Sequence, residues 1–404
     1  MRGAIGAVPT VMSWPLIKPL SADGMLSAAS AATGLDDYGE PRFLQGLAVL
    51  ADSLCFEARL NQMGRMVLSA DLVRMLSNRL RFQRDVTRHP EILEETVAAP
   101  IVITGLPRTG TSKLHRMISA DPQVQRLEVW KLLNPAPLPG EPARGPQERI
   151  NFALLVERTL AKQFPDYMAA HPIEALEPDE EALLMEMSFE CVVSSLKTRA
   201  PQHRAFVESR DPCPTYEYTR EMLQYLQWQD GGGRGRPWIM KSPLHIGNLM
   251  TLLNVFPGAT VVHCHRDPRV AIVSFASLVE ASRRMTSDDV DATEIGGDVL
   301  DFLSRQIERN MLHRGQVGEE QIIDVPYERI RDTPEMVIGE IYACAGRKLT
   351  VGACDAMRRY AARRPEGHFG KHAYLADRYG LDGEMIGTAF ADYWERFGRM
   401  AAAG

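Results

Sequence analysis

The stretch that decides the fold runs from residue 100 to residue 118 and reads Pro-Ile-Val-Ile-Thr-Gly-Leu-Pro-Arg-Thr-Gly-Thr-Ser-Lys-Leu-His-Arg-Met-Ile. Its first residues are apolar and β-branched, which is typical of a buried strand. Leu114, Met117 and Ile118 are spaced for one face of a helix. A strand, a glycine-rich turn and a helix in this order can bind phosphate, because backbone N–H groups and the helix N-terminus face the anion.

The loop of this stretch, residues 105–112, differs from the phosphate loop of nucleotide triphosphatases. That loop reads G-x4-G-K-[ST]; its lysine reaches the β- and γ-phosphates and its hydroxyl holds Mg²⁺. Here Thr111 replaces the lysine, and the cation is Arg108 inside the loop. This disfavours γ-phosphoryl transfer and favours Arg108, Thr111 and Ser112 as ligands of one 5′-phosphate and its attached group. A Gly/Pro-rich turn without a ligand is the alternative.

Three further strands are predicted, at residues 238–240, 259–264 and 322–325, with helical patterns between them at 249–256, 270–284 and 299–313. This alternation indicates an α/β fold with a P-loop-like parallel sheet flanked by helices. Residues 36–95 and 150–230 are predicted to add N-terminal and mid-chain helical segments. Within the second, the acids of residues 174–190 indicate an amphipathic helix with a charged outer face. We expect residues 1–34 to form an extended arm and residues 35–404 to form a single α/β domain.

A second anion site is predicted after the third strand. Arg266 lies just past the strand end, and Asp267-Pro268 suits the start of a helix, with Asp as the cap. Ser274 falls about two turns into that helix. Arg266 and Ser274 can therefore hold a second phosphate. An ion pair of Asp267 with Arg266 or Arg269 that only stabilises the turn explains the same residues equally well.

Polar residues also follow the second strand, in Lys241-Ser-Pro-Leu-His245. Open parallel sheets bind ligands at the carboxyl ends of their strands. Lys241 can stabilise charge on a leaving oxygen, and His245 can position that oxygen or act as a base. A surface lysine beside a helix-capping Ser242 is the alternative.

Composition places few limits on partners. The chain has 404 residues, 45% of them hydrophobic, and a net charge of −6, so nothing general points to nucleic acid. No apolar stretch is long enough to cross a bilayer. The six cysteines form no C-x-x-C pair, which favours free thiols in a reducing compartment and hence the cytoplasm. Both a monomer and a homo-oligomer remain open.

Together these motifs resemble the sulfotransferases that use 3′-phosphoadenosine-5′-phosphosulfate, in the bacterial branch distantly similar to tyrosylprotein sulfotransferases. The resemblance runs from about residue 35 to residue 400. It is carried by five stretches: residues 105–112, 127–135, 241–245, 265–274 and 372–381. A P-loop nucleotide kinase or triphosphatase is the rival enzyme, with Asp324 as the only obvious acidic strand end for Mg²⁺. A non-catalytic nucleotide-binding relative is the second alternative.

The resemblance implies a role for each matching residue. The loop around the donor's 5′-phosphosulfate would comprise Arg108, Thr109, Gly110, Thr111 and Ser112. Arg266 and Ser274 would bind the 3′-phosphate, while Lys241 and Arg108 would stabilise the transition state. Glu128 lies in the region that supplies the catalytic base of the tyrosylprotein enzymes, with His245 and His115 as rivals for that role.

The acceptor is predicted to be a small molecule that carries a hydroxyl group. Apolar residues of the mid-chain segment favour a partly apolar acceptor, although core packing explains them equally well: Phe152, Phe164, Tyr167, Met185 and Phe189. No metal is expected, since cationic side chains and backbone amides neutralise the charge. His368 and His372 have a spacing that can bind zinc in a helix, but Gly367 and Gly370 argue against a regular helix there.

Overall fold

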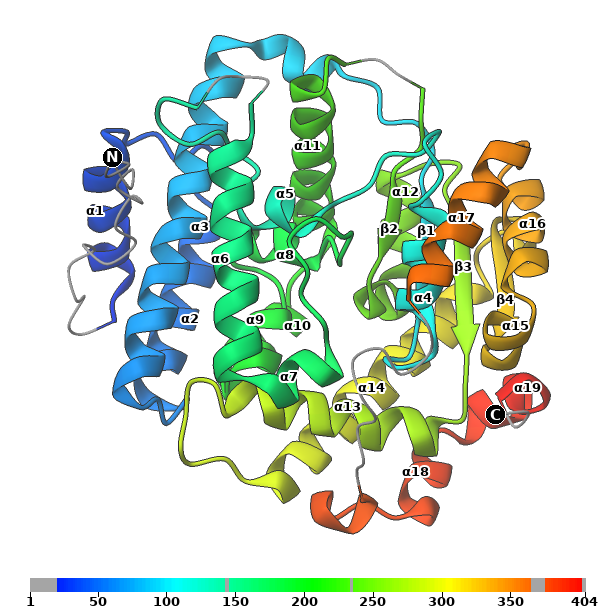
Figure 1. Cartoon of the computed structure of the whole chain (residues 1–404). Coiled ribbons are helices and arrows are strands. Elements are labelled where there is room, and N and C mark those ends of the chain that lie inside the picture. The colour runs from blue at the N-terminus through cyan, green and yellow to red at the C-terminus, as the bar shows by residue number, and fades with distance from the viewer. Residues whose placement is uncertain (1–19, 142–144, 233–234, 365–374, 402–404) are drawn as a thin grey trace, which may run out of the picture.

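The computed structural model describes residues 20–141, 145–232, 235–364 and 375–401 (Figure 1). In this part of the chain four parallel strands form one sheet in the order β2-β1-β3-β4. The strands are β1 Ile101–Gly105, β2 Ile239–Lys241, β3 Thr260–His265 and β4 Ile322–Pro326. The predicted α/β class is confirmed, and the bounds of every strand lie within one residue of those expected.

Helices surround the sheet and make up most of the described chain. Their bounds are α1 Ala22–Thr33, α2 Phe43–Phe56, α3 Gln62–Arg88, α4 Thr111–Ile118, α5 Val129–Leu133, α6 Gln147–Gln163, α7 Pro165–Ala170, α8 Ala182–Met185, α9 Val193–Lys197, α10 Pro201–Glu208, α11 Cys213–Gln229, α12 Leu249–Val255, α13 Pro268–Arg283, α14 Ala292–Arg314, α15 Tyr327–Asp332, α16 Pro334–Cys344, α17 Val351–Arg363, α18 Gly383–Ala389 and α19 Ala391–Ala401. None of them combines the length and apolarity that a membrane-spanning helix needs.

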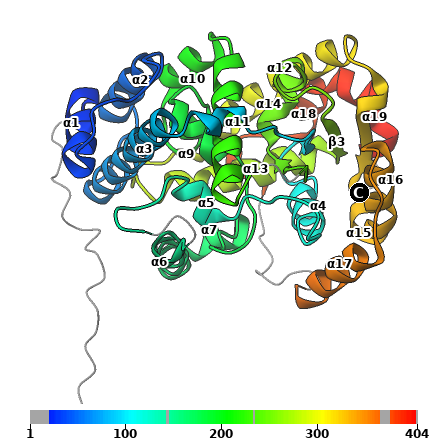
Figure 2. The ribbon, with the colours of Figure 1, turned by 90° about the horizontal axis from the view of Figure 1, so that it is seen from above.

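Both faces of the sheet are buried, as the apolar strands predict. Side chains alternate between the two faces of a strand. Ile101 and Ile103 of β1 accordingly pack in a cluster with residues of α4, α16 and α17, whereas Val102 joins the larger core with residues of α11, α12 and α14. The two groups of helices lie on opposite sides of the sheet (Figure 2). This double cover leaves the carboxyl ends of the strands as the place for a ligand.

The predicted extended arm is wrong for the residues described. Residues 22–33 form α1, which packs against α3. The side chain of Ser21 accepts a hydrogen bond from the Gly24 amide at the helix start, and Gly34 ends the helix at φ 69°. Met25 and Ala29 are fully buried one turn apart. The alanine-rich sequence conceals this helix because its buried face is built from small residues. Residues 1–19 lie outside the described residues.

The predicted amphipathic helix over residues 174–190 is also wrong. The acids of this segment face inward, with Glu181 fully buried and Glu186 only 5% exposed. Residues 174–181 are irregular, and only the short α8 and a 3-10 turn, Glu186–Ser188, follow. Partners from distant segments explain the burial, since a buried carboxylate needs a compensating charge. Lys197, for example, lies 2.5 Å from Glu186.

Candidate functional site

The loop after β1 has a backbone that glycine makes possible. Gly105 and Gly110 have φ values of 151° and 84°, and a Cβ at Gly105 would lie 2.4 Å from the carbonyl oxygen of Cys264. Arg108 is itself left-handed, with φ 70°. The Thr109 hydroxyl donates to the Leu106 carbonyl at 2.7 Å. The loop is therefore held in shape from inside and leads directly into α4.

A cavity of about 360 Å³ opens beside this loop. Three of the elements predicted to meet at the carboxyl edge of the sheet contribute to it: the loop after β1, the start of the segment after β2, and α13 after β3. Six predicted site residues line it, namely Arg108, Gly110, Thr111, Ser112, Arg266 and Ser274. Thr109 is fully buried beneath the loop.

Arg266 and Arg108 meet at the edge of the sheet. Arg266 Nη1 donates to the carbonyl oxygen of Arg108 at 2.9 Å, and Arg108 Nε donates to the Ser274 hydroxyl at 3.2 Å. The Arg266 guanidinium also lies over the Tyr327 ring, 4.1 Å from its centroid. Its Nε atom is buried with no hydrogen-bond partner in the described part of the chain. Such an orphaned donor beside a cavity fits an anion that binds there.

Asp267 takes the role that sequence reasoning allowed for it. It caps α13, accepting from the Arg269 amide at 2.8 Å, and its carboxylate pairs with the Arg269 side chain at 2.7 Å. Pro268 stands at the first turn, as predicted. The ion pair of the turn thus engages Arg269 and leaves the Arg266 side chain to face Arg108 and Tyr327.

Lys241 stands at the end of β2 among three successive acids. Its Nζ lies 2.5 Å from Glu180 Oε1 and 3.9 Å from Asp179 Oδ1, and its backbone amide donates to Glu181 at 2.8 Å. Its side chain is 3% exposed. The ammonium is therefore buried, charge-compensated and adjacent to Glu180, which lines the cavity.

His245 is placed too deep to be a base. Its Nε2 lies 2.5 Å from Glu181 Oε1, its Nδ1 is hydrogen-bonded to the Tyr216 hydroxyl at 2.8 Å, and its side chain is fully buried. Burial in the acid-rich layer raises the pKa of Tyr216 well above its usual range, so the phenol stays protonated. His245 thus supports Glu181, which in turn binds the Lys241 amide.

Glu128 does not reach the cavity. It precedes α5, and its two carboxylate oxygens each lie 3.0 Å from a cation, Arg126 or Lys131. It is absent from the cavity lining among the described residues. The carboxylate of Glu128, which the resemblance nominated as the base, thus pairs with cations at the start of α5.

His115 is equally unsuited to proton transfer. It lies on α4 and is 1% exposed. Burial, assisted by the charge of Lys241, lowers the pKa of His115 to about 3. The folded protein therefore keeps this imidazole neutral at every pH near neutrality.

This pKa predicts acid sensitivity of the fold. An unfolded histidine binds a proton below about pH 6.5 and folded His115 does not, so the stability it contributes is complete above that pH and is lost as the pH falls. At pH 5 the loss from His115 amounts to about 2 kcal/mol of unfolding free energy. Urea denaturation measures the fall in the free energy of unfolding between pH 7 and pH 5. This fall should be smaller by about 2 kcal/mol in His115→Asn than in the wild type. An equal fall in both proteins would contradict the assignment.

Sequence reasoning missed several cavity residues, among them His171, Asp179 and Glu180. His171 follows α7, and its Nε2 lies 3.2 Å from Asp179 Oδ2. Burial raises the pKa of the Asp179 carboxyl, but the neighbouring His171, Lys241 and Arg116 outweigh burial and hold this pKa well below its usual range. Asp179 is accordingly an anion. The only signal in the sequence was a histidine and a run of acids in a segment read as a solvated helix.

The remaining cavity wall is largely apolar. It comes from the mid-chain helices and α13, as in Ile173, Leu183, Leu196, Leu278 and Val279. Of the two predicted helical segments, residues 150–230 supply much of this lining, whereas residues 36–95 supply none of the described lining residues. Of the five apolar residues singled out in the sequence, Tyr167 lines the cavity; Met185 and Phe189 belong to the core, as core packing predicted.

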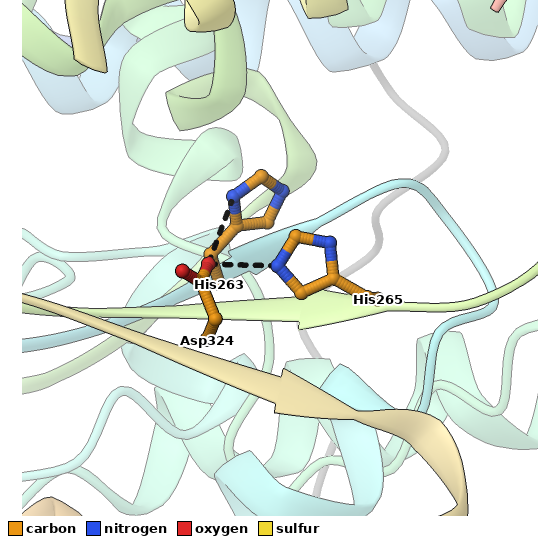
Figure 3. A group of neighbouring side chains, drawn as sticks. All are labelled: His263, His265 and Asp324. Carbon is orange, nitrogen blue, oxygen red and sulfur yellow. Dashed lines mark hydrogen bonds and ion pairs between the residues drawn. The ribbon is translucent and has the colours of Figure 1, made fainter. Parts of the chain in front are cut away.

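Asp324, the acid that a kinase would need, is engaged elsewhere. Figure 3 shows it beside His263 and His265, a grouping with the composition of a metal site. Both Asp324 oxygens accept from the Arg314 guanidinium, at 2.7 and 2.6 Å, and one also lies 2.8 Å from His265 Nε2. Tyr393 of α19 bonds the other nitrogen of His265. The carboxylate that would bind a metal ion is thus occupied by a guanidinium. His368 and His372 lie outside the described residues.

A phosphate-type loop and a second cationic strand end thus border one cavity of an α/β fold. The model of the Sulfotransferase family matches residues 100–350, so the chain belongs to this family. Omega-hydroxy-beta-dihydromenaquinone-9 sulfotransferase Stf3 from Mycobacterium bovis is 27% identical over 263 residues, which cover 62% of this chain and 64% of that protein. The match therefore spans less than two thirds of this relative.

Solved structures agree over nearly the whole chain. The crystal structure of sulfotransferase STF1 from Mycobacterium tuberculosis H37Rv has a TM-score of 0.77 at 29% identity and covers 93% of this chain and 100% of that one. The structure of sulfotransferase STF9 from Mycobacterium avium has a TM-score of 0.84 at 26% identity and covers 95% and 98% of the two chains. The P-loop-like fold is therefore shared with sulfotransferases beyond the segment that the family model matches.

Proposed function

We propose that this member of the sulfotransferase family transfers a sulfonate group from 3′-phosphoadenosine-5′-phosphosulfate to a hydroxyl of a small, partly apolar acceptor. The observation that carries the proposal is the meeting of Arg108 and Arg266 at one cavity, 2.9 Å from guanidinium to carbonyl. A donor with a phosphosulfate at one position and a phosphate at another needs two cationic groups of this kind. The lysine that triphosphatases require is absent from the loop.

The cationic and hydroxyl side chains of the site would have separate roles in the reaction. Arg108, Thr111, Ser112 and the amides at the start of α4 would hold the 5′-phosphosulfate, and Arg266 with Ser274 would hold the 3′-phosphate. The donor supplies an activated sulfonate. Lys241, which now pairs with Glu180, would offset the negative charge on the bridging oxygen as the sulfonate leaves. Holding donor and acceptor in line supplies much of the remaining rate.

The position of Asp324 does not support the alternative that the protein is a kinase or triphosphatase. Phosphoryl transfer needs an acidic ligand for Mg²⁺ near the phosphate loop. Asp324 is instead bound on both oxygens by Arg314, and it does not line the cavity. Turnover that survives excess chelator is expected for sulfonate transfer.

The acceptor is proposed to be an apolar alcohol. The cavity wall away from the loop is largely apolar, with Lys197 and Ser282 as polar members. The name of the relative from Mycobacterium bovis specifies an ω-hydroxylated menaquinone derivative as its acceptor. The volume of about 360 Å³ admits the hydroxyl end of such a molecule. The six free cysteines of the protein support the cytoplasm as the compartment in which the protein would act.

Removing Arg266 should weaken donor binding selectively. A charged hydrogen bond to phosphate contributes about 1.5–3 kcal/mol, so calorimetry with adenosine 3′,5′-bisphosphate should show at least tenfold weaker binding in Arg266→Ala. Arg269→Ala is the matched control, because Arg269 is exposed and pairs with Asp267 on the same turn; its affinity should equal that of the wild type. Wild-type protein that does not bind, or Arg266→Ala that binds unchanged, would refute the proposed function.

A further inference from the structure

We infer that His171, oriented by Asp179, is the general base that removes the proton of the acceptor hydroxyl. The inference rests on the proposed function and adds to it the one group that the donor-binding residues do not provide. Direct transfer to an alcohol requires a proton acceptor beside the sulfonate. Neither of the two residues is among the candidates that the sequence suggested.

The position of His171 is set from both sides. It follows α7, and its neighbours Ala170 and Pro172 both accept hydrogen bonds on their carbonyl oxygens. Arg108 Nη1 donates to Ala170 at 2.7 Å, and Arg116 Nη2 of α4 donates to Pro172 at 3.0 Å. The two arginines belong to the phosphate loop and the helix that follows it. His171 is therefore tied to the loop that would hold the sulfonate.

The pair has the geometry of an oriented base. His171 lines the cavity and its side chain is 23% exposed, while that of Asp179 is 5% exposed. With Nε2 3.2 Å from the carboxylate, Asp179 selects the tautomer that carries hydrogen on Nε2. Nδ1 then keeps its lone pair for the acceptor. The other oxygen of Asp179 accepts from the Glu180 amide at 2.8 Å, so the carboxylate cannot turn away.

Other groups near the cavity are committed to different partners. Glu180 is bound to Lys241 at 2.5 Å and screens that ammonium. His115 and His245 are buried, and Glu128 faces Arg126 and Lys131. The Tyr167 ring also lies beside His171, with 6.2 Å between the two ring centroids. Burial raises the pKa of the Tyr167 phenol to about 12, so this group stays protonated.

The proton and electrons balance without any further reagent. The acceptor oxygen forms its bond to sulfur while His171 Nδ1 takes the hydroxyl proton. The bond between sulfur and the bridging oxygen breaks, and its electron pair leaves with adenosine 3′,5′-bisphosphate beside Lys241. The imidazolium, stabilised by Asp179, then returns its proton to solvent.

His171→Ala should lose at least about 10²-fold in kcat, the usual contribution of a general base. The assay measures transfer of ³⁵S-labelled sulfonate to farnesol and to 1-naphthol. The loss should be greater for farnesol, because a phenol releases its proton more readily than an alcohol does. The fall in kcat/KM at acid pH should disappear in the variant. Affinity for adenosine 3′,5′-bisphosphate should not change. His89→Ala, an exposed histidine paired with Glu91, is the control and should behave as wild type.

Two results would overturn the inference. The first is kcat in His171→Ala within a few-fold of wild type; the second is loss of the acid limb in Glu180→Gln while His171→Ala keeps it. A separate measurement needs no acceptor: nitrogen NMR of histidine-labelled protein bound to adenosine 3′,5′-bisphosphate should show the Nε2–H tautomer at His171 and its loss in Asp179→Asn. An Nδ1–H tautomer in the wild type would exclude the inference. Binding of the bisphosphate without transfer to either alcohol would count against the proposed function, and the tautomer would still decide the role of the pair.

Discussion

Replacing Arg108 by alanine should abolish the proposed sulfonate transfer, with a fall in turnover of about 10³-fold or more. Guanidinium groups that stabilise a planar transferring group contribute about 10³–10⁵-fold in the related chemistry of phosphoryl transfer. Arg108 also joins three elements, since it donates to Ser274 of α13 and to Ala170 of α7. The variant would lose the stabilisation of charge on the sulfonate and, at the same time, the contacts that hold Ser274 and Ala170 in position. Turnover of labelled donor, measured with saturating acceptor, tests the prediction.

Arg108→Lys separates charge from shape. Lysine keeps the positive charge but lacks the planar fork that donates in two directions. It should therefore restore only part of the activity, and thermal denaturation should show both variants folded as the wild type is. Turnover in Arg108→Ala within tenfold of wild type would contradict a role in the transfer step.

Replacing Asp324 by alanine should destabilise the fold by about 3 kcal/mol, because removal of one partner leaves the other charge buried and unpaired. The side chain of Arg314 is only 5% exposed and donates two hydrogen bonds to this carboxylate, with a third contact to His263. His265 would lose the partner of its Nε2 atom as well. Urea denaturation at pH 7 measures the change in the free energy of unfolding.

Asp332→Ala is the control for Asp324→Ala. Asp332 pairs with Arg331 at 2.7 Å, but both side chains are exposed. Water replaces such a pair at little cost, so this variant should unfold at the wild-type urea concentration. If Asp324→Ala were as stable as Asp332→Ala, the interactions of Asp324 with Arg314 and with the histidines drawn in Figure 3 would not stabilise the fold.

The sheet was predictable from the sequence because its strands report their environment directly. Strands buried on both faces are runs of β-branched residues, and the Gly, Pro and Asp residues that end them mark the turns. The four strands were accordingly placed within one residue. α1 was not found, since its buried face consists of Met25 and small residues, whose contacts with α3 are determined by tertiary packing alone.

The site divides in the same way. Arg108, Arg266 and Lys241 lie at or just after strand ends, and Ser274 lies on the helix that follows β3. Local patterns therefore locate them, and the parallel sheet brings the strand ends together. His171 and Asp179 come from an irregular segment. Its acids look like a solvated face in sequence, because the cations that neutralise them, such as Lys241, come from elsewhere in the chain. Charge pairs between distant segments produce no periodic pattern in the sequence, so these residues could not be predicted from it.

The close contact of Gly105 with the Cys264 carbonyl has a consequence for the selection of the proposed donor. No side chain fits between β1 and β3 at this point, so the spacing of two adjacent strands, about 4.8 Å, sets how far apart Arg108 and Arg266 begin. For the proposed donor, the sheet then fixes the separation of the two arginines that would bind its charged groups. A nucleotide with charge at only one end engages one arginine and leaves the other unmatched, and discrimination against it depends on the rigid backbone more than on adjustable side chains.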